Sequence, residues 1–368
     1  MKKGRKKDSS FAKMFCLVTA LTVSAGLLTG TENLAKICVG SVLPSIDFNS
    51  SVKSSISRAS ASLLKTNDEK NEKKSDKISS DNLAYVPDDI KSLIDEANKN
   101  SSSDKKDGAI VEHLYGISSA TDSYGSILVR NASDKGIDIE SVLSQSPDLK
   151  IESPSEKPSI LIFHTHTTES YQILDRDFYA VGFTSRSEDP SKNMVRIGNE
   201  IASQLKSAGF KVIHDTEIYD RTYNGSYDRS GAAIDKILKQ YPSIQVILDI
   251  HRDAIQNSNG TKTKPVALIN GKKAAQIMII SGCEGDGVTG FPDWKYNLRF
   301  ALKLQQKCAE NYPQLMRPLL FDNRRYNMYK SHCSLLIEVG SDSNTLDEAA
   351  YSGRLLGVSL AQMLKEYT

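Results

Sequence analysis

Short apolar runs alternate with amphipathic segments over the second half of the chain. Each apolar run is short enough for a buried strand, and between the runs apolar residues recur at helical spacing. Strands separated by helices pair in parallel through right-handed crossovers, so the sequence predicts an α/β fold with a mostly parallel sheet and helices on both faces. The expected strands are 160–163, 210–214, 246–250, 266–269, 275–281 and 335–339, and the expected helices are 193–207, 229–240, 294–310 and 346–367.

The N-terminal pattern is different, because a basic segment precedes an uncharged one. Residues 1–13 are rich in lysine and arginine, and residues 14–28 are apolar or hydroxyl-bearing. This order is typical of a secretory signal or of a membrane anchor with a cytoplasmic N-terminus. We therefore expect residues 1–44 to form a basic N-terminus and a membrane anchor or signal segment. The pattern leaves open whether this segment is cleaved, and either outcome puts the rest of the chain outside the cytoplasm.

Three further segments follow from composition. Residues 45–107 are dominated by Ser, Lys, Asp, Glu and Asn, so they cannot bury enough apolar surface to offset their chain entropy and are expected to be a flexible polar linker. Residues 108–157 regain apolar positions and predict a small strand-bearing prelude. Residues 158–368 hold the alternating strands and helices of the main domain.

Overall composition narrows the class of partner. With 39% hydrophobic and 25% charged residues the chain is globular, and a net charge of +2 predicts no strong electrostatic partner. No cluster of Lys and Arg interleaved with aromatic residues marks a nucleic-acid surface, so no nucleic-acid partner is expected. The five cysteines have no CxxC spacing, which argues against a thiolate zinc site.

Polar side chains suited to metal binding follow two of the predicted strands, and a carboxylate lies within a third. His166 and Glu169 lie in the loop after 160–163, and His251 follows 246–250. A catalytic zinc needs three such ligands and an open position for water, so these residues are the predicted ligands of Zn²⁺. Glu338 lies within a strand where an unpaired carboxylate is costly, which predicts a functional role as the proton carrier.

Two neighbouring side chains leave alternatives open. His164 is two residues from His166 and should share its face, so either histidine can be the ligand, or both can line the site. Asp249 lies in the same strand as His251 and can orient it, or can be a simple hydrogen-bond acceptor at the strand end.

Several segments together resemble the stage II sporulation protein P family of endospore-forming bacteria. From about Leu161 onward they read ILIFHTHTTESY, NMVRIGNEIASQLKSAGFKVIHD, SYDRS, VILDIHRDA and LLIEVGSDSNT. The resemblance implies that 158–368 is the catalytic domain of a zinc-dependent N-acetylmuramoyl-L-alanine amidase. Such an enzyme cuts peptidoglycan between the lactyl group and the stem peptide, and endopeptidase activity on peptide crosslinks is also attributed to the family.

The same resemblance implies a cellular location and a biological role. It points to a single-pass protein of the cell membrane whose catalytic domain lies on the extracytoplasmic side. It also implies a role in septal wall thinning and engulfment during sporulation, with stage II sporulation proteins D and M as partners.

More distantly, the order of His, helix, strand-borne His and strand-borne Glu is similar to the amidase_3 group of zinc amidases. That group has a glycine-rich loop around its first His and takes its Glu ligand from the first helix. Here the loop reads HTHTTES and Asn193 stands at the helix start, so Glu169 replaces that ligand or Glu200 on the helix does. Two other functions stay open: a zinc carboxypeptidase-like peptidase, and a non-catalytic scaffold that binds the wall.

Overall fold

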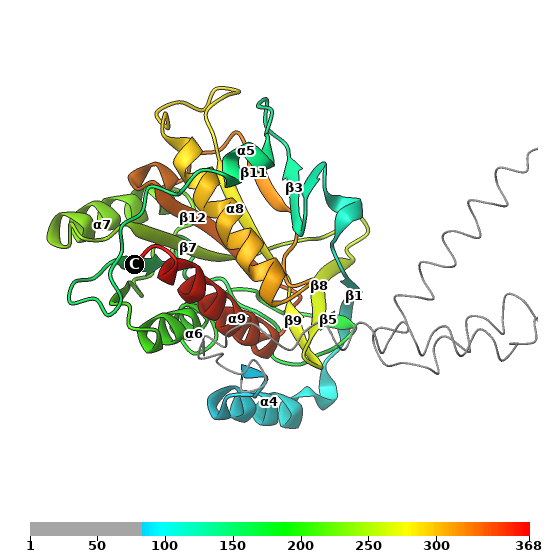
Figure 1. Cartoon of the computed structure of the whole chain (residues 1–368). Coiled ribbons are helices and arrows are strands. Elements are labelled where there is room, and N and C mark those ends of the chain that lie inside the picture. Colours follow the sequence, from blue (N-terminus) through cyan, green and yellow to red (C-terminus); the bar gives the residue numbers. More distant parts are fainter. Residues whose placement is uncertain (1–82) are drawn as a thin grey trace, which may run out of the picture. The chain divides into compact units, whose positions relative to one another are not determined.

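A large mixed sheet lies at the centre of the computed structural model, which describes residues 83–368 (Figure 1). Its strand order is β2-β3-β11-β10-β12-β7-β4-β6. Most neighbours are parallel, but β10 runs antiparallel to β12 and β2 antiparallel to β3. The predicted α/β class with a mostly parallel sheet is confirmed. The strands are β2 (Asp122–Tyr124), β3 (Ile127–Asn131), β4 (Ile160–Phe163), β6 (Val212–His214), β7 (Val246–Asp253), β10 (Ile277–Gly282), β11 (Leu319–Asp322) and β12 (Cys333–Ser341).

Helices cover both faces of this sheet. Alternate residues of β4 explain the two layers: Ile160 and Ile162 belong to the main core under three helices, whereas Leu161 packs with Ile234 of a helix on the other face. The three helices are α6 (Met194–Ser207), α8 (Trp294–Asn311) and α9 (Leu346–Lys365), the opposite one is α7 (Ser226–Gln240), and the short α5 (Ile139–Leu143) packs against α8.

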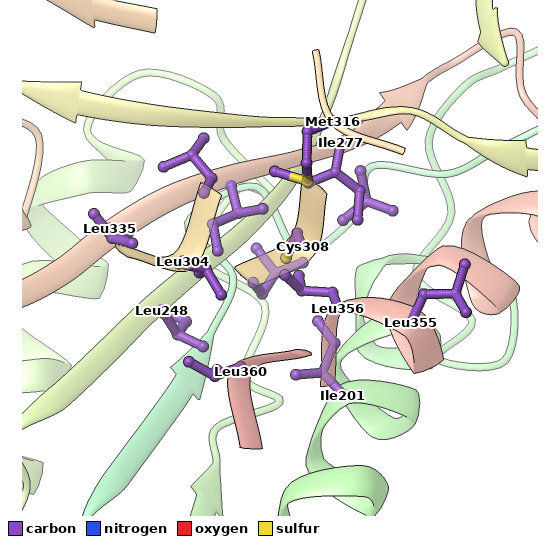
Figure 2. Packing of buried hydrophobic residues seen from close by; sticks show 14 of the residues in the cluster. Ile201, Leu248, Ile277, Leu304, Cys308, Met316, Leu335, Leu355, Leu356 and Leu360 are labelled. Carbon is purple, nitrogen blue, oxygen red and sulfur yellow. The ribbon is translucent and has the colours of Figure 1, made fainter. Parts of the chain in front are cut away.

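Side chains from three helices and the sheet meet in the main core. Figure 2 shows Leu248 and Leu335 of the sheet facing Leu304 of α8 and Leu360 of α9. All four are fully buried, and burying a leucine contributes about 1.5–3 kcal/mol. Cys308 is also buried here as a free thiol, and it packs as a small hydrophobic residue.

Local capping residues determine where several of the helices begin. The Asn193 side chain accepts a hydrogen bond from the backbone N–H of Val195 and caps α6. Thr345 and Glu348 form a capping box at the start of α9. The predicted start of α7 at Arg229 was late, because Gly225 with φ +77° lets the helix begin at Ser226.

A second, four-stranded sheet changes two predicted elements. It has the order β5-β1-β8-β9. The single strand predicted at 275–281 is two strands in different sheets, divided at Gln276, whose side chain bonds to the backbone of Tyr115. The predicted strand-bearing prelude is divided between the two sheets, since β1 joins the second sheet and β3 the large one. These strands are β1 (Lys106–His113), β5 (Phe178–Ala180), β8 (Lys262–Ile269) and β9 (Lys272–Ala275), and the 3-10 turns are η2 (Ser101–Ser103), η3 (Ile117–Ser119) and η4 (Met328–Lys330).

Helix α4 (Asp88–Asn100) corrects the predicted flexible linker 45–107 over its last part. Its Asp89 pairs with Arg196 of α6 at 2.8 Å, and the chain just before it is held by Arg354 of α9, which donates to the carbonyls of Leu83 and Tyr85. Composition missed this because a few apolar residues, Leu83 and Ile90 in the core with Leu93 and Ile94 against it, attach the segment together with these polar contacts. The predicted anchor 1–44 and the linker up to residue 82 lie outside the described residues.

Within residues 83–368, each helix is too short or too polar to cross a membrane.

Candidate metal centre

The predicted site residues come from the carboxyl ends of three adjacent strands. β12 pairs with β7 and β7 pairs with β4, all in parallel, so their ends meet at one edge. His251 and Glu338 are register partners, so their side chains lie on the same face of the sheet. Neighbouring Ile250 and Ile337 belong to the core under α6, α8 and α9, which puts His251 and Glu338 on the side of α7.

The H-x-x-E segment forms a single turn. The backbone N–H of Glu169 donates to the carbonyl of His166 at 3.1 Å. Glu169 Oε2 then lies 3.5 Å from His251 Nδ1, and the rings of His166 and His251 have their centroids 5.3 Å apart. The structure therefore brings together all four predicted residues at one place, with the three ligand candidates from two separate strand ends.

Three buried polar atoms at this place have no hydrogen-bond partner among the described residues: His166 Nδ1, His251 Nε2 and Glu338 Oε2. His251 Nε2 lies 2.8 Å from Asp249 Oδ1, but the two atoms lack the alignment of a hydrogen bond. Buried polar atoms are normally paired, so unpaired ones are evidence for an absent partner. Imidazole nitrogens and a carboxylate are the donor set that zinc prefers, and these residues fit that ion.

The ligand candidates are nevertheless not as tightly gathered as another group. In residues 83–368 the side chains whose ligand atoms all lie within 4.8 Å of one another are Glu112, Asp175 and Glu348. That group already surrounds the ammonium of Lys264, which lies 2.6 Å from Asp175 and 2.7 Å from Glu348. A cation of the chain itself satisfies these carboxylates, so we do not interpret the group as a metal site.

His164 and Glu200, the alternative ligands, are occupied elsewhere. His164 contacts the carbonyl of Ile250 through Nδ1 and His214 through Nε2, each at 2.9 Å. The expectation that His164 shares a face with His166 was wrong, because β4 ends at Phe163 and the chain then turns. Glu200 is paired with two arginines, Arg196 at 2.8 Å and Arg354 at 3.0 Å.

Burial and neighbouring charges shift the protonation of these groups in opposite directions. Burial raises the pKa of Glu338 to about 8. Burial also acts to raise the pKa of Glu169, but the His251 hydrogen bond and the Arg252 charge outweigh it and bring the value to about 2. Burial lowers the pKa of His166 and acts in the same direction on His251, whose pKa is nevertheless raised by the Asp249 and Glu169 carboxylates. Glu169 is therefore charged at neutral pH while Glu338 can exchange a proton.

Several residues that were not predicted from the sequence surround His166. Tyr223 stacks on its ring at 4.7 Å, and Tyr227 of α7 meets it edge-on at 5.6 Å. Asp220 Oδ2 lies 3.9 Å from His166 Nδ1 and also binds Arg186, whose guanidinium is 3.9 Å from Glu169. The segment SYDRS, which contains Tyr227, and the aromatic- and arginine-rich loop 172–192, which contains Arg186, were the signals that could have found these two residues.

A chain of hydrogen bonds holds Asp249 in place beside His251. Thr165 donates from its backbone N–H and its hydroxyl to the two oxygens of Asp249, at 2.8 and 2.7 Å. Thr165 also contacts Ser230 of α7 at 2.8 Å, and Ser230 receives a hydrogen bond from Asn327. Asp249 is thereby fixed beside His251, which agrees with the orienting role among its two predicted alternatives.

Solved structures of several hydrolases overlap this chain partially. The CwlD amidase from Clostridioides difficile, solved in complex with the GerS lipoprotein, is 12% identical with a TM-score of 0.37, over 56% of this chain and 99% of that one. An N-acetylmuramoyl-L-alanine amidase from Clostridium difficile 630 is 14% identical with a TM-score of 0.36, over 58% and 97%. A metallo-carboxypeptidase from Burkholderia cenocepacia is 7% identical with a TM-score of 0.35, over 60% of each chain. Overlaps this partial do not assign an activity to this chain.

Comparison with related sequences identifies the family of this chain. Stage II sporulation protein P from Bacillus subtilis (strain 168) is 26% identical over 227 residues, which are 57% of this chain and 53% of that protein. The match thus spans about half the length of the curated relative. The profile of the family described as stage II sporulation protein P (SpoIIP) matches residues 38–361. This chain belongs to the stage II sporulation protein P family.

Proposed function

We propose that this chain is a zinc-dependent N-acetylmuramoyl-L-alanine amidase that cuts peptidoglycan between N-acetylmuramic acid and the L-alanine of the stem peptide. The observation that carries the proposal is the set of unpaired buried atoms on His166, His251 and Glu338, gathered beside Glu169. A scaffold that only binds the wall has no need of an unpaired buried carboxylate, which costs stability. Family membership supports the sporulation setting.

Metal binding and proton transfer fall to different residues in the proposed hydrolysis. Zinc, when held by His166, Glu169 and His251, supplies a Lewis acid for the amide carbonyl and for water. Glu338 takes the proton of the attacking water at Oε2 and returns it to the leaving nitrogen. Burial raises the pKa of Glu338 above that of an ordinary carboxyl, which favours both transfers because a proton carrier works best when its pKa is close to the operating pH.

Neighbouring groups hold these side chains in place. The backbone N–H of Arg252 donates to Glu169 Oε2 at 3.2 Å, and Asp249 orients His251. Tyr223 and Tyr227 cover two sides of the His166 ring and limit its rotation. Preorganised ligands reduce the reorganisation needed during the reaction.

The proposal includes a place of action. The N-terminal segment 1–44 would hold the catalytic domain on the outer side of the cell membrane, within reach of the wall, during septal thinning and engulfment. Stage II sporulation proteins D and M would be its partners, and peptide crosslinks would be a second substrate. The basic and apolar pattern of residues 1–28 and the family membership support this part.

Mass spectrometry of peptidoglycan fragments tests the reaction. Purified wall is incubated with the full chain, with and without a chelator, and the products are identified. We expect free stem peptides and peptide-free glycan, with loss of both products on chelation and their return when zinc is added.

Other products would contradict the proposal. Muropeptides that keep their lactyl-linked stems would exclude the amidase. Release of C-terminal residues, lost when the peptide terminus is amidated, would instead identify the carboxypeptidase-like alternative.

A further inference from the structure

A hollow lined by tyrosines adjoins the metal centre on the side of α7. Its volume is about 430 Å³, within the range of small-molecule sites. We call it the tyrosine hollow, and its main lining residues are Tyr227, Asp228, Arg325, Tyr326 and Tyr329, with Lys330 and Asp235 beside them.

Tyr227 is the wall shared by the hollow and the metal centre. One contact of its ring is with His251, in stacked orientation at 6.4 Å, and another is with Tyr326 at 4.9 Å. The hollow therefore begins one aromatic ring away from the reacting position. Anything held in it would be joined to the scissile bond by a short length of substrate.

The loop that carries Tyr326 is fixed rather than loosely placed. Tyr326 has φ +44°, a conformation that is rare for residues other than glycine and that persists only when the surroundings impose it. Asn327 holds the loop on α7 through the Tyr227 carbonyl and the Ser230 hydroxyl. A fixed loop beside a reaction centre is suited to binding.

The charges of the hollow are of both signs, and two of them are unmatched. Lys330 and Asp235 neutralise each other at 2.5 Å. Asp228 and Arg325 form no ion pair within residues 83–368; Arg325 only donates to the Thr289 carbonyl and lies over the Tyr329 ring at 4.5 Å. An exposed carboxylate and an exposed guanidinium in one hollow complement a ligand that carries both an amino group and a carboxylate.

We propose that the tyrosine hollow binds the stem peptide of the substrate, with a peptide carboxylate against Arg325 and a peptide amino group against Asp228. The inference rests on the proposed function, since it places the part of the substrate on one side of the bond that is cut. A neutral sugar ring would use the tyrosines but would leave both charges without a partner, so the charges favour the peptide.

A pair of matched substrates tests this inference with the full chain. One is a muramoyl peptide with a free amino group and a free terminal carboxylate, and the other is the same compound acetylated and amidated. We expect the ratio of kcat/KM for the free over the blocked substrate to be about tenfold in the wild type, the size of one charged hydrogen bond. The ratio should approach one in Asp228→Asn/Arg325→Gln.

The control variant Asp95→Asn/Arg130→Gln removes the same charges from exposed positions on α4 and β3 and should keep the wild-type ratio. A ratio that is equal in the wild type and in Asp228→Asn/Arg325→Gln would overturn the inference. Calorimetric titration of the free stem peptide gives a reading that needs no turnover, and binding should weaken about tenfold in the same variant.

The two measurements separate the inference from the function on which it rests. Failure of the wild type to cut either substrate would reject the amidase, while the titration would still report on the hollow. Equal cutting of both substrates would keep the amidase and reject the hollow. Binding of peptide-free glycan that is lost in Tyr329→Ala, with peptide binding unchanged in Asp228→Asn/Arg325→Gln, would also reject it in favour of a sugar site.

Discussion

Two clusters of charged and polar side chains in this molecule differ in how their atoms are paired. The lysine cluster, Lys264 and Lys273 with Glu112, Asp175 and Glu348, gives every carboxylate an ammonium within 3.4 Å. Its carboxylates converge more closely than the side chains of the metal centre. Convergence alone is therefore a poor guide to a metal site.

The metal centre has the opposite character. His166 Nδ1 and Glu338 Oε2 are buried without a hydrogen bond, and no opposite charge of the described residues lies closer to His166 Nδ1 than Asp220 at 3.9 Å. Glu348 Oε1 of the lysine cluster also makes no hydrogen bond, but the Lys264 ammonium lies 2.7 Å from it. Leaving such atoms unpaired costs stability unless an absent partner restores it. The contrast separates a structural cluster, whose loss should affect folding, from a functional one, whose loss should affect turnover.

The largest effect is expected for Glu338→Gln. The amide keeps the shape of the side chain but cannot carry the proton, so kcat should fall by about 10²–10⁴ while bound zinc stays the same. Hydrolysis assays and elemental analysis of the purified variant measure the two quantities. Glu112→Gln is the matched change in the lysine cluster and should leave kcat unaltered. Retained turnover in Glu338→Gln would remove its role as proton carrier.

Lys264→Met should lower the free energy of unfolding and leave kcat unchanged. The variant leaves the buried Glu348 carboxylate without its ammonium, which is expected to lower the free energy of unfolding by about 3 kcal/mol. Denaturant unfolding measures this value, and kcat per folded molecule should not change. Addition of Glu348→Gln should recover part of the stability. A fall in kcat at unchanged stability would show that the lysine cluster is not structural.

Asp249→Asn tests the support of the metal centre. The amide can still accept from Thr165, but it removes the negative charge beside His251, so zinc affinity should drop about 10–100-fold. Competition with a chelating dye measures the affinity. Asp148→Asn is the control, because Asp148 forms an exposed pair with His332 at 2.6 Å and contacts none of the predicted ligands. Equal effects of the two variants would count against the orienting role.

The smallest effect is expected for Lys273→Met. Lys273 pairs with Glu112 and Asp175, but all three side chains are more than two-fifths exposed, and such pairs contribute at most about 1 kcal/mol. Thermal unfolding of Lys273→Met beside Lys264→Met gives the comparison directly. A loss as large as that of Lys264→Met would mean that burial does not govern the strength of this cluster.

The sequence could predict the site residues that lie at the ends of strands. Apolar runs placed the strands, and parallel pairing brought His251 and Glu338 to one edge. Sequence periodicity could not separate His164 from His166, because alternation stops where β4 ends and the turn begins. Asp220 and Tyr223 lie in a loop without regular periodicity, so nothing local marked their approach to His166.

Fold prediction failed where charge or chain direction decided the outcome. Helix α4 is attached through Ile90 in the main core, through Asp89 and through the carbonyls bound by Arg354, contacts whose partners lie far away in sequence. The reversal of β10 against β12 was missed because a buried strand is apolar in either direction. Only packing against the neighbouring strands fixes that direction.

The position of β12 also affects the stage of synthesis at which the sheet can be completed. It is the last strand of the chain described and yet it lies between β10 and β7, so the sheet cannot close until β12 has been made. Glu338 lies on this same strand. A nascent chain that stops before β12 thus lacks both the strand that joins β10 to β7 and the proposed proton carrier, so the sheet and the proposed site are completed by the same strand.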